Sequence, residues 1–551
     1  MGNKVVINVN GLLDLSFDIG TTVYDIMLEA KKKLFKTFVG AKINNVLVDY
    51  SEKIYDNVRI DFIDYTDLQG NKMYQSGLKF ILILAIKSLW GKDVSFKYSL
   101  DKGIYVQVDK KMTEDDIVVL KKKMNDIVSY NYPIKKHVVA SENAIRYYLE
   151  SKDFEKALNV QNIPNRYVEM YEIVHSYNYF YSSMPYSTDC LSIFDIKLVD
   201  KNAIVLLFPR VDSNGELPDF HFNPLIYNEL LRYSKWSESL HNSYVSDMNE
   251  KVARGEVVSF IKMNNIFIDE SLYNISKDIV RKRKNVKVIL LGGPSSSGKT
   301  TSTHRLCNYL EAYGLKPIMI SLDDYFKERV DTPKDKNGNY DFESIDAIDI
   351  KLFNKQLKSL LDGKEVIIPK FNFLTGEKEY NRDPLILHDD NILLIEGIHC
   401  LNDKVTEKID RENKYKVLIC PFTPLGLDQH NHLSTTDMRL IRRIVRDNRV
   451  RGRSVEVTLK FWSDVKYGED NYIFPYTDDI DAVFNTAYAY ELGVLRVFAE
   501  PLLFAVPRNS SYYDEARRLL GLLRMFYPIS SEYLDNDNVL REFIGGSLYE
   551  T

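Results

Sequence analysis

One stretch constrains the fold of this chain more than any other. Residues 286–292 read Val-Lys-Val-Ile-Leu-Leu-Gly, a pattern typical of a buried strand, and a glycine-rich turn and a helical pattern from Lys299 to about Tyr313 follow. The turn has the spacing Gly293-x-x-x-x-Gly298-Lys299-Thr300. Glycines at these positions let backbone amides turn inward around a polyphosphate, and a helix N-terminus adds its positive dipole end.

This pattern predicts a P-loop in an α/β fold with a parallel sheet flanked by helices. Lys299 would reach the β- and γ-phosphates of a nucleotide, and the Thr300 hydroxyl would ligate Mg²⁺. The residues predicted to bind the nucleotide are Gly293, Pro294, Ser295, Ser296, Ser297, Gly298, Lys299, Thr300 and Thr301.

Two later strand patterns end in acids. Residues 315–322 form an apolar run that Asp323 and Asp324 follow, and residues 391–395 form another that ends at Glu396. Because the carboxyl ends of parallel strands face the phosphates in such folds, we predict Asp323 as the general base, with Asp324 as second choice. Glu396 would hold Mg²⁺ together with Thr300. The plainer alternatives are helix capping for the aspartates and solvation for Glu396.

An arginine-rich helix is predicted from about Thr436 to Arg453. Its arginines at 442, 446, 449 and 453 step by four, three and four, so they share one face, and Arg439 and Arg443 flank them. A face with few acids suits a lid that clamps transferring phosphates through bidentate donors. Binding of an RNA backbone is the alternative.

Length, charge and cysteine usage narrow the class of protein. A chain of 551 residues is too long for one core, so we expect three or four domains. The net charge of −5 argues against a generally basic DNA- or RNA-binding chain, although a local patch would still be compatible with it. The four cysteines form no Cys-x-x-Cys pair, which favours reduced thiols in a cytoplasm, and no apolar run is long enough to span a membrane.

From about residue 286 to 506 the sequence resembles the uridine kinase and phosphoribulokinase group of P-loop kinases. The motifs that carry the resemblance are Gly293–Thr300, Ser321–Phe326, Tyr340–Ala347, Gly363–Pro369, Leu394–Gly397 and Arg442–Asp447 with Arg451-Gly-Arg453. The resemblance implies catalytic roles for Asp323, Lys299, Arg442 and Arg446. It implies substrate contacts for Asp324, Tyr325, Glu343, Phe371, Arg439, Arg443, Arg449 and Arg453, with Glu343 in place of an aspartate that holds ribose hydroxyls.

Two positions depart from that group. Phe371 takes the place of an aromatic residue that contacts the base, and Gly376 stands where a base-reading histidine is expected. The expected reaction is transfer of the γ-phosphate of ATP (or GTP), with Mg²⁺, to the 5′-hydroxyl of a nucleoside, uridine or cytidine first. The alternatives are a kinase of another small hydroxyl compound, such as a sugar phosphate or a pantothenate-like acid, and an RNA-binding regulatory ATPase.

The N-terminal part resembles the front of threonyl-tRNA synthetases. Residues 1–65 have a strand–strand–helix–strand order similar to the TGS domain, and residues 66–225 are similar to the second, editing domain of those enzymes. That editing domain carries a metal-binding cluster, and the positions aligned with it here are Ser76, Phe80, Ser182 and Tyr186. None is a good metal ligand, so we expect the editing chemistry to be absent. Structural support and RNA or ligand sensing by residues 1–225 both stay open.

The remaining divisions are predicted from helical patterns. Residues 226–284 would form a helical connector with helices at 227–236, 257–263 and 268–281 and a linker near 275–285, and residues 285–507 the kinase-like domain. Residues 508–551 would form a C-terminal extension with a helix at 513–526, similar to that of long bacterial uridine-kinase-like proteins. A homo-oligomer is compatible with the sequence.

Overall fold

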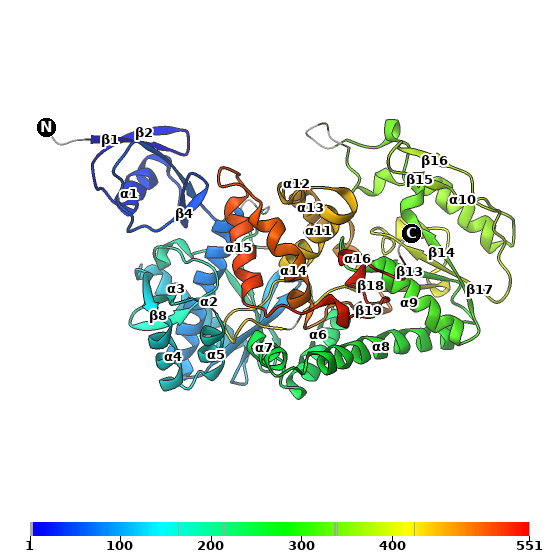
Figure 1. Cartoon of the computed structure of the whole chain (residues 1–551), viewed down its shortest axis with the longest axis horizontal. Helices are drawn as coiled ribbons and strands as arrows, with labels where there is room; N and C mark the ends of the chain where they lie inside the picture. The colour runs from blue at the N-terminus through cyan, green and yellow to red at the C-terminus, as the bar shows by residue number, and fades with distance from the viewer. Residues whose placement is uncertain are drawn as a thin grey trace.

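The computed structural model describes residues 4–163, 165–211, 213, 215–334, 338, 340–423 and 425–549 (Figure 1). Its first unit is a five-stranded sheet in the order β2-β1-β5-β3-β4 with one helix packed on it. The elements are β1 (Lys4–Val9), β2 (Leu13–Asp18), α1 (Val23–Leu34), β3 (Gly40–Ile43), β4 (Val46–Val48) and β5 (Val58–Ile63). This order agrees with the strand–strand–helix–strand prediction.

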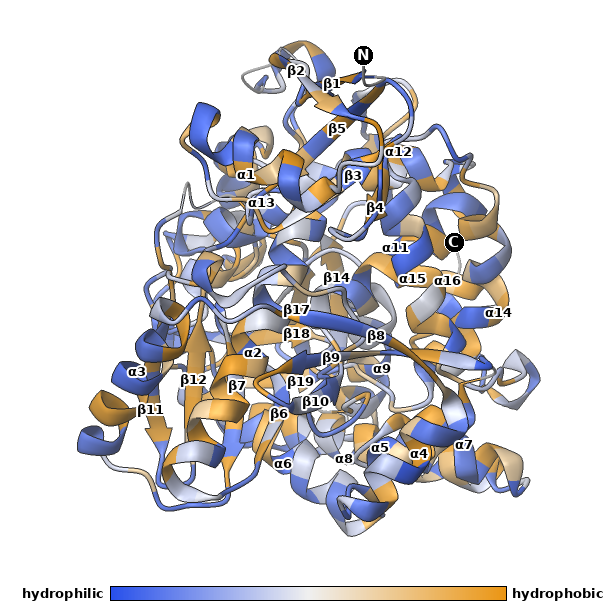
Figure 2. Cartoon of the chain, turned by 90° about the vertical axis from the view of Figure 1, so that its left-hand side faces the viewer, coloured by the Kyte–Doolittle hydropathy of each residue, from blue (hydrophilic) through white to orange (hydrophobic). Residues whose placement is uncertain are grey.

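The second unit contains two sheets, with strand orders β10-β9-β8 and β11-β12-β7-β6. Its elements are α2 (Leu68–Trp90), β6 (Val94–Leu100), β7 (Gly103–Val108), α3 (Glu114–Ser129), β8 (Lys135–Ala140), α4 (Ser141–Glu150), α5 (Phe154–Asn162), β9 (Tyr167–Ile173), β10 (Ser176–Tyr179), β11 (Asp195–Asp200) and β12 (Ala203–Leu207). Figure 2 shows β7 and β12 in the hydrophobic colour, and both strands are almost entirely buried.

Helix α2 is longer than the apolar run that predicted it. The sequence pattern indicated a helix from Leu78, but the helix begins at Leu68, because the Asp67 carboxylate caps it by accepting from the amides of Gln69 and Gly70. The first part of α2 mixes polar and apolar residues, and so the apolar pattern alone missed it.

A single long helix leads into the next unit. The connector holds α6 (Pro224–Ser239), α7 (Val245–Ala253) and α8 (Val257–Lys282). Helix α8 runs without a break along the lower edge of the molecule in Figure 1, so the predicted break between two helices and the linker from 275 are wrong. Asn264, which lies between the two predicted helices, is buried inside α8, donates to the Phe260 carbonyl and accepts from the Ala489 amide.

The third unit is a five-stranded parallel sheet in the order β14-β17-β13-β18-β19. Its strands and the nearby hairpin are β13 (Val288–Gly292), β14 (Lys316–Ser321), β15 (Lys370–Asn372), β16 (Glu377–Glu379), β17 (Asn391–Glu396), β18 (Lys414–Cys420) and β19 (Ala482–Asn485). Its helices are α9 (Lys299–Ala312), α10 (Ile350–Leu361), α11 (Thr435–Arg451), α12 (Val455–Lys460), α13 (Trp462–Tyr472), α14 (Glu491–Phe504), α15 (Tyr513–Arg524) and α16 (Arg541–Ile544).

Alternate residues of β13 point to opposite faces of this sheet. Ile289 and Leu291 pack into a core shared with α8 and α9, whereas Val288 and Leu290 pack into a core shared with α10. The sheet is therefore covered on both faces, as the α/β prediction requires. No described helix is both long enough and apolar enough to cross a membrane.

Candidate functional site

The P-loop connects β13 to α9, as the sequence predicts. Gly298 has a φ of 82° and Ser296 a φ of 59°, so both turn in the left-handed region that brings successive amides to one side. A Cβ on Gly293 would collide with the Ile419 carbonyl of β18, so only glycine fits there. Lys299 folds back and donates to the Pro294 carbonyl at 3.2 Å. Thr300 lies exposed at the start of α9.

Three neighbouring strands bring the predicted acids to this loop. Glu396 lies level with Ser321 of β14 and with Leu291 of β13, one residue before the end of that strand. The Ser321 hydroxyl donates to the Glu396 carboxylate at 2.9 Å. Asp323 follows Ser321 by two residues in a short 3₁₀ turn. The register of the sheet thus places the P-loop, Glu396 and Asp323 at one edge.

The carboxylates at this edge are held in a poorly solvated environment. Burial raises the pKa of Asp323 and the neighbouring Asp324 adds to the effect, while Lys299 and Arg451 oppose it. Burial, followed by the charge of Asp323, raises the pKa of Glu396 to about 7. Such acids gain from a nearby cation, which would lower their pKa values again.

Three of the predicted lid arginines, Arg439, Arg442 and Arg443, are buried, and the first two pair with buried glutamates. Arg442 is fully buried and pairs with Glu491 at 2.6 Å. It also donates to the Thr486 carbonyl at 2.8 Å. Arg439 pairs with Glu469 and donates to the Ser295 carbonyl at 3.0 Å. These bonds favour a structural role, in which both arginines support the P-loop from behind, over the predicted contact with a transferring phosphate.

The other arginines of this region separate into different neighbourhoods. The Arg443 guanidinium donates to the Ser295 hydroxyl of the P-loop at 2.8 Å, and Arg446 pairs with Asp447. Arg449 donates to the carbonyls of Glu542 and Phe543, and Arg453 lies over the Phe461 ring. The predicted arginine face is therefore divided among several partners. Arg451, which belongs to the motif at 451–453 but was given no role of its own, is an arginine whose charge lowers the pKa of Asp323.

The side chains predicted to contact the acceptor have protein partners. Asp324 accepts from the Phe371 amide at 3.3 Å and from Arg382 at 2.8 Å, and the buried Tyr325 donates to Gln356. Phe371 is buried against Phe326, with ring centroids 5.7 Å apart. These contacts disfavour Asp324 as a base and place Phe371 in a wall of the site.

Glu343 and Gly376 complete that side. Burial raises the pKa of Glu343 to about 7, and the nearby Arg443 opposes this rise. Gly376 has a φ of 78°, and a Cβ there would press on the Arg329 side chain. Backbone geometry therefore explains the glycine at the position where a base-reading histidine was expected.

Comparison with known proteins identifies this unit. Residues 288–491 match the phosphoribulokinase / uridine kinase family. They form a P-loop kinase domain of that family. This kinase-family domain is similar to a uridine kinase from Lactobacillus helveticus, with 28% identity over 34% of this chain and 81% of that protein. It is also similar to uridine-cytidine kinase-like 1 from Mus musculus, with 30% identity over 35% of this chain and 32% of that protein.

The N-terminal region has a different relative. It is 30% identical to a threonine–tRNA ligase from Caldanaerobacter subterraneus over 30% of this chain. The chain spans 26% of the length of that ligase. The region thus consists of synthetase-like modules joined to the kinase-family domain.

Sequence reasoning missed a contact between the C-terminal segment and the kinase-family domain. The Glu542 carboxylate accepts from the Thr301 amide at 3.3 Å and from the Thr301 hydroxyl at 3.0 Å. Thr301 follows Thr300 in the first turn of α9, where amides are available to a phosphate. Val539 packs against Gly298 of the P-loop. No sequence signal links positions 241 residues apart, and the predicted boundary at 507 separated them.

The four positions aligned with the metal cluster of the editing domain lie in different surroundings. Ser76 and Ser182 line one pocket, whereas Phe80 packs against Phe180 in the core. Tyr186 accepts from Lys31 of the first unit at 3.2 Å. Among the described residues, no group of three or more histidine, cysteine, aspartate or glutamate side chains is placed to hold a metal ion together.

Proposed function

We propose that this chain transfers the γ-phosphate of ATP or GTP to the 5′-hydroxyl of a nucleoside, with uridine and cytidine as the first substrates to test. The observation that carries the proposal is the Asp323 carboxylate. It lies at a strand end beside the P-loop, and no described residue makes a hydrogen bond or an ion pair with it. A base with a raised pKa and no protein partner suits proton transfer from a hydroxyl.

The donor side would be held by the P-loop amides and Lys299. The loop would fix the position of the nucleotide's phosphates. Arg439, Arg442 and Arg443 in turn hold the loop through hydrogen bonds to Ser295 and Ser296. Arg446 and Arg451 are the arginines best placed to reach transferring charge, because among the described residues both pair with a single shared carboxylate, that of Asp447.

The oxygen donors present suit Mg²⁺. No described residue bonds the exposed Thr300 hydroxyl, and Ser321 donates to only one oxygen of Glu396. A hydroxyl and a carboxylate at the phosphate edge are donors that Mg²⁺ takes while keeping several waters. When bound, the ion would neutralise phosphate charge. Thr300 and Glu396 would hold it.

From its place beside the P-loop, Asp323 would accept the proton of the acceptor's attacking hydroxyl. Glu343 supports a ribose-bearing acceptor, because a half-buried acid can bind hydroxyls and repels an anionic substrate. Phe371 and its aromatic neighbours would form an apolar wall for the base.

The test is a substrate panel. The purified full chain, ATP and Mg²⁺ are incubated with each ribonucleoside, with sugar phosphates and with pantothenate, and phosphorylated products are identified by mass spectrometry. A nucleoside monophosphate formed by the parent and lost in Asp323→Asn supports the proposal. A phosphorylated product from another acceptor, or ATP hydrolysis stimulated by RNA without any phosphorylated small molecule, would overturn it.

A further inference from the structure

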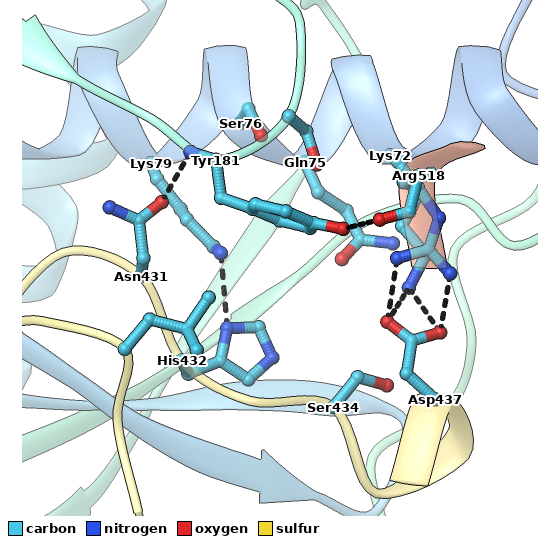
Figure 3. A pocket seen from close by; sticks show the side chains of 12 residues that line it. Lys72, Gln75, Ser76, Lys79, Tyr181, Asn431, His432, Ser434, Asp437 and Arg518 are labelled. Atoms are coloured by element: carbon cyan, nitrogen blue, oxygen red, sulfur yellow. Dashed lines mark hydrogen bonds and ion pairs between the residues drawn. The ribbon is translucent and has the colours of Figure 1, made fainter. Parts of the chain in front are cut away.

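A second polar pocket lies at the N-terminal end of α11, where three parts of the chain meet. It is lined by α2, by the segment after β10, by the turn before α11 and by α15 (Figure 3). Lys72, Ser76 and Lys79 are spaced by four and three residues, so they share one face of α2. The cavity measures about 40 Å³, room for roughly three waters or one small ion.

The acidic group at this pocket is already neutralised. Asp437 in the first turn of α11 accepts two bonds from Arg518, at 2.8 and 2.9 Å, and Lys72 lies 3.3 Å away. Figure 3 shows these bonds on one side of the cavity. The charge of Arg518 holds the pKa of Asp437 well below its usual range despite burial. Asp437 therefore has no charge left to balance another cation.

Lys79 is the cation without a counterion. It is 6% exposed, and no described carboxylate lies within ion-pair distance of its ammonium. Its polar partner is the Nδ1 atom of His432 at 3.0 Å, and burial lowers the pKa of that imidazole well below its usual range, so His432 supplies no charge. Burial and the neighbouring Lys72 lower the pKa of Lys79 to about 7, whereas the buried Asp428 opposes the shift. The Phe96 ring, 5.7 Å from the ammonium, offers a cation–π contact but no counter-charge. A buried ammonium without a counterion is costly, and an anion beside it would lower that cost.

Further donors surround the same space. Ser76 is 5% exposed, and no described residue bonds its hydroxyl. The Ser434 side chain precedes α11 without capping it, so the first amides of that helix have no side-chain acceptor there. A buried hydroxyl, a buried ammonium and a helix N-terminus together form a set of donors that suits an anion with several oxygens.

We propose that this pocket binds a small oxyanion of phosphate size through Lys79, Ser76 and the first turn of α11. The anion would be inorganic phosphate or the phosphate group of a metabolite. An anion bound at the start of α11 would contact the same helix whose arginines bond the P-loop. The proposal does not depend on the nature of the kinase acceptor.

The test uses the full chain with Lys299→Ala, which weakens phosphate binding at the P-loop. Thermal unfolding is followed with rising inorganic phosphate at constant ionic strength, because a ligand bound only by the native state raises the midpoint. We expect a phosphate-dependent rise in Tm. Adding Lys79→Met should weaken phosphate binding about tenfold or more, and adding Ser76→Ala about threefold. Lys122→Met, an exposed lysine on α3, is the matched control and should change nothing.

Each outcome decides the proposal. Lys79→Met removes a buried charge, so it should not lower the midpoint without phosphate; if it fails to fold, Ser76→Ala carries the test. An equal response to acetate would replace the phosphate-sized oxyanion with a carboxylate and overturn the proposal as stated. A response to glycerol phosphate matching that to phosphate would assign the site to a metabolite's phosphate group, and a response to phosphate alone would assign it to the free ion. Phosphate stabilisation that is absent, or that persists in both pocket variants, would overturn the proposal.

Discussion

The phosphate side and the acceptor side of the kinase-family domain are prepared differently. On the phosphate side, the Thr300 hydroxyl and the Asp323 carboxylate have no bond from any described residue. On the acceptor side, Asp324 and Tyr325 have protein partners and Phe371 is buried. Under the proposed function, free polar groups would carry out phosphate transfer, whereas the acceptor would be selected mainly by the shape of a packed wall.

The largest expected effect comes from replacing each of the two neighbouring aspartates, Asp323 and Asp324, by asparagine. Asp323→Asn should reduce turnover about a thousandfold, because it removes the proposed base. Asp324→Asn is the matched control and should keep turnover within about tenfold of the parent, since its contacts with Arg382 and Phe371 are structural. Product formation is measured for both variants. Equal losses would remove the distinction between the two sides.

The arginine helix sharpens the same contrast. Arg442→Met should lower the free energy of unfolding by about 3–5 kcal/mol, because Glu491 would lose its partner in the core. Arg446→Met should leave stability nearly unchanged and reduce turnover, because Arg446 is partly exposed beside Asp447. Urea unfolding and product formation are measured together. A stable Arg442→Met variant with low turnover would return Arg442 to the phosphate-clamping role.

The pKa of Glu343 provides a test on the acceptor side. In the folded chain it is raised to about 7 from an ordinary 4.5. Between these values the unfolded chain releases the proton first, so the native state loses stability as pH rises. Glu343→Gln lacks this loss. Its stability relative to the parent should therefore grow from pH 4.5 to 7, by at most about 3 kcal/mol, and then stay level.

Urea unfolding at a series of pH values measures this difference. Glu328→Gln, an exposed glutamate nearby, is the control and should show no such trend. A flat difference for Glu343→Gln would mean that Glu343 is ionised in the native state throughout, as a polar acceptor side would require.

The smallest expected effect concerns Thr301, a polar residue on the phosphate side that does have a protein partner. The Thr301 amide is already bonded by Glu542. Glu542→Gln removes a negative charge beside the phosphate-binding turn, so ATP should bind about two- to fivefold more tightly. Equilibrium binding of ATP with Mg²⁺ is measured against Glu532→Gln, an exposed glutamate in the same segment. Weaker binding would show that Glu542 supports the nucleotide rather than competing with it.

The sequence predicted the parts of the site that depend on local pattern. A strand, a glycine turn and a helix are adjacent in the chain, and acids at strand ends meet because parallel strands align their carboxyl ends. For this reason the P-loop and the neighbourhood of Asp323 and Glu396 agree with the predictions. The roles assigned to these residues stay predictions.

What the sequence could not provide depends on distant partners. Arg442 and Arg446 follow the same helical spacing in the sequence. Only the fold shows that Arg442 is buried in an ion pair with Glu491. The same holds for Asp437, whose partner Arg518 lies on another helix. Charge patterns along one helix do not distinguish an arginine that meets a ligand from one that meets a buried carboxylate.

The C-terminal segment has a consequence for synthesis of the protein. Val539, Leu540 and Phe543 are fully buried in the core that also holds Ile289 and Leu291 of β13. A ribosome makes β13 some 250 residues before it reaches them, a delay on the order of tens of seconds. During that interval the parallel sheet lacks part of its apolar cover. We therefore expect the kinase-family domain to finish folding only after the C-terminal segment has been made, either with the help of a chaperone or slowly after release from the ribosome.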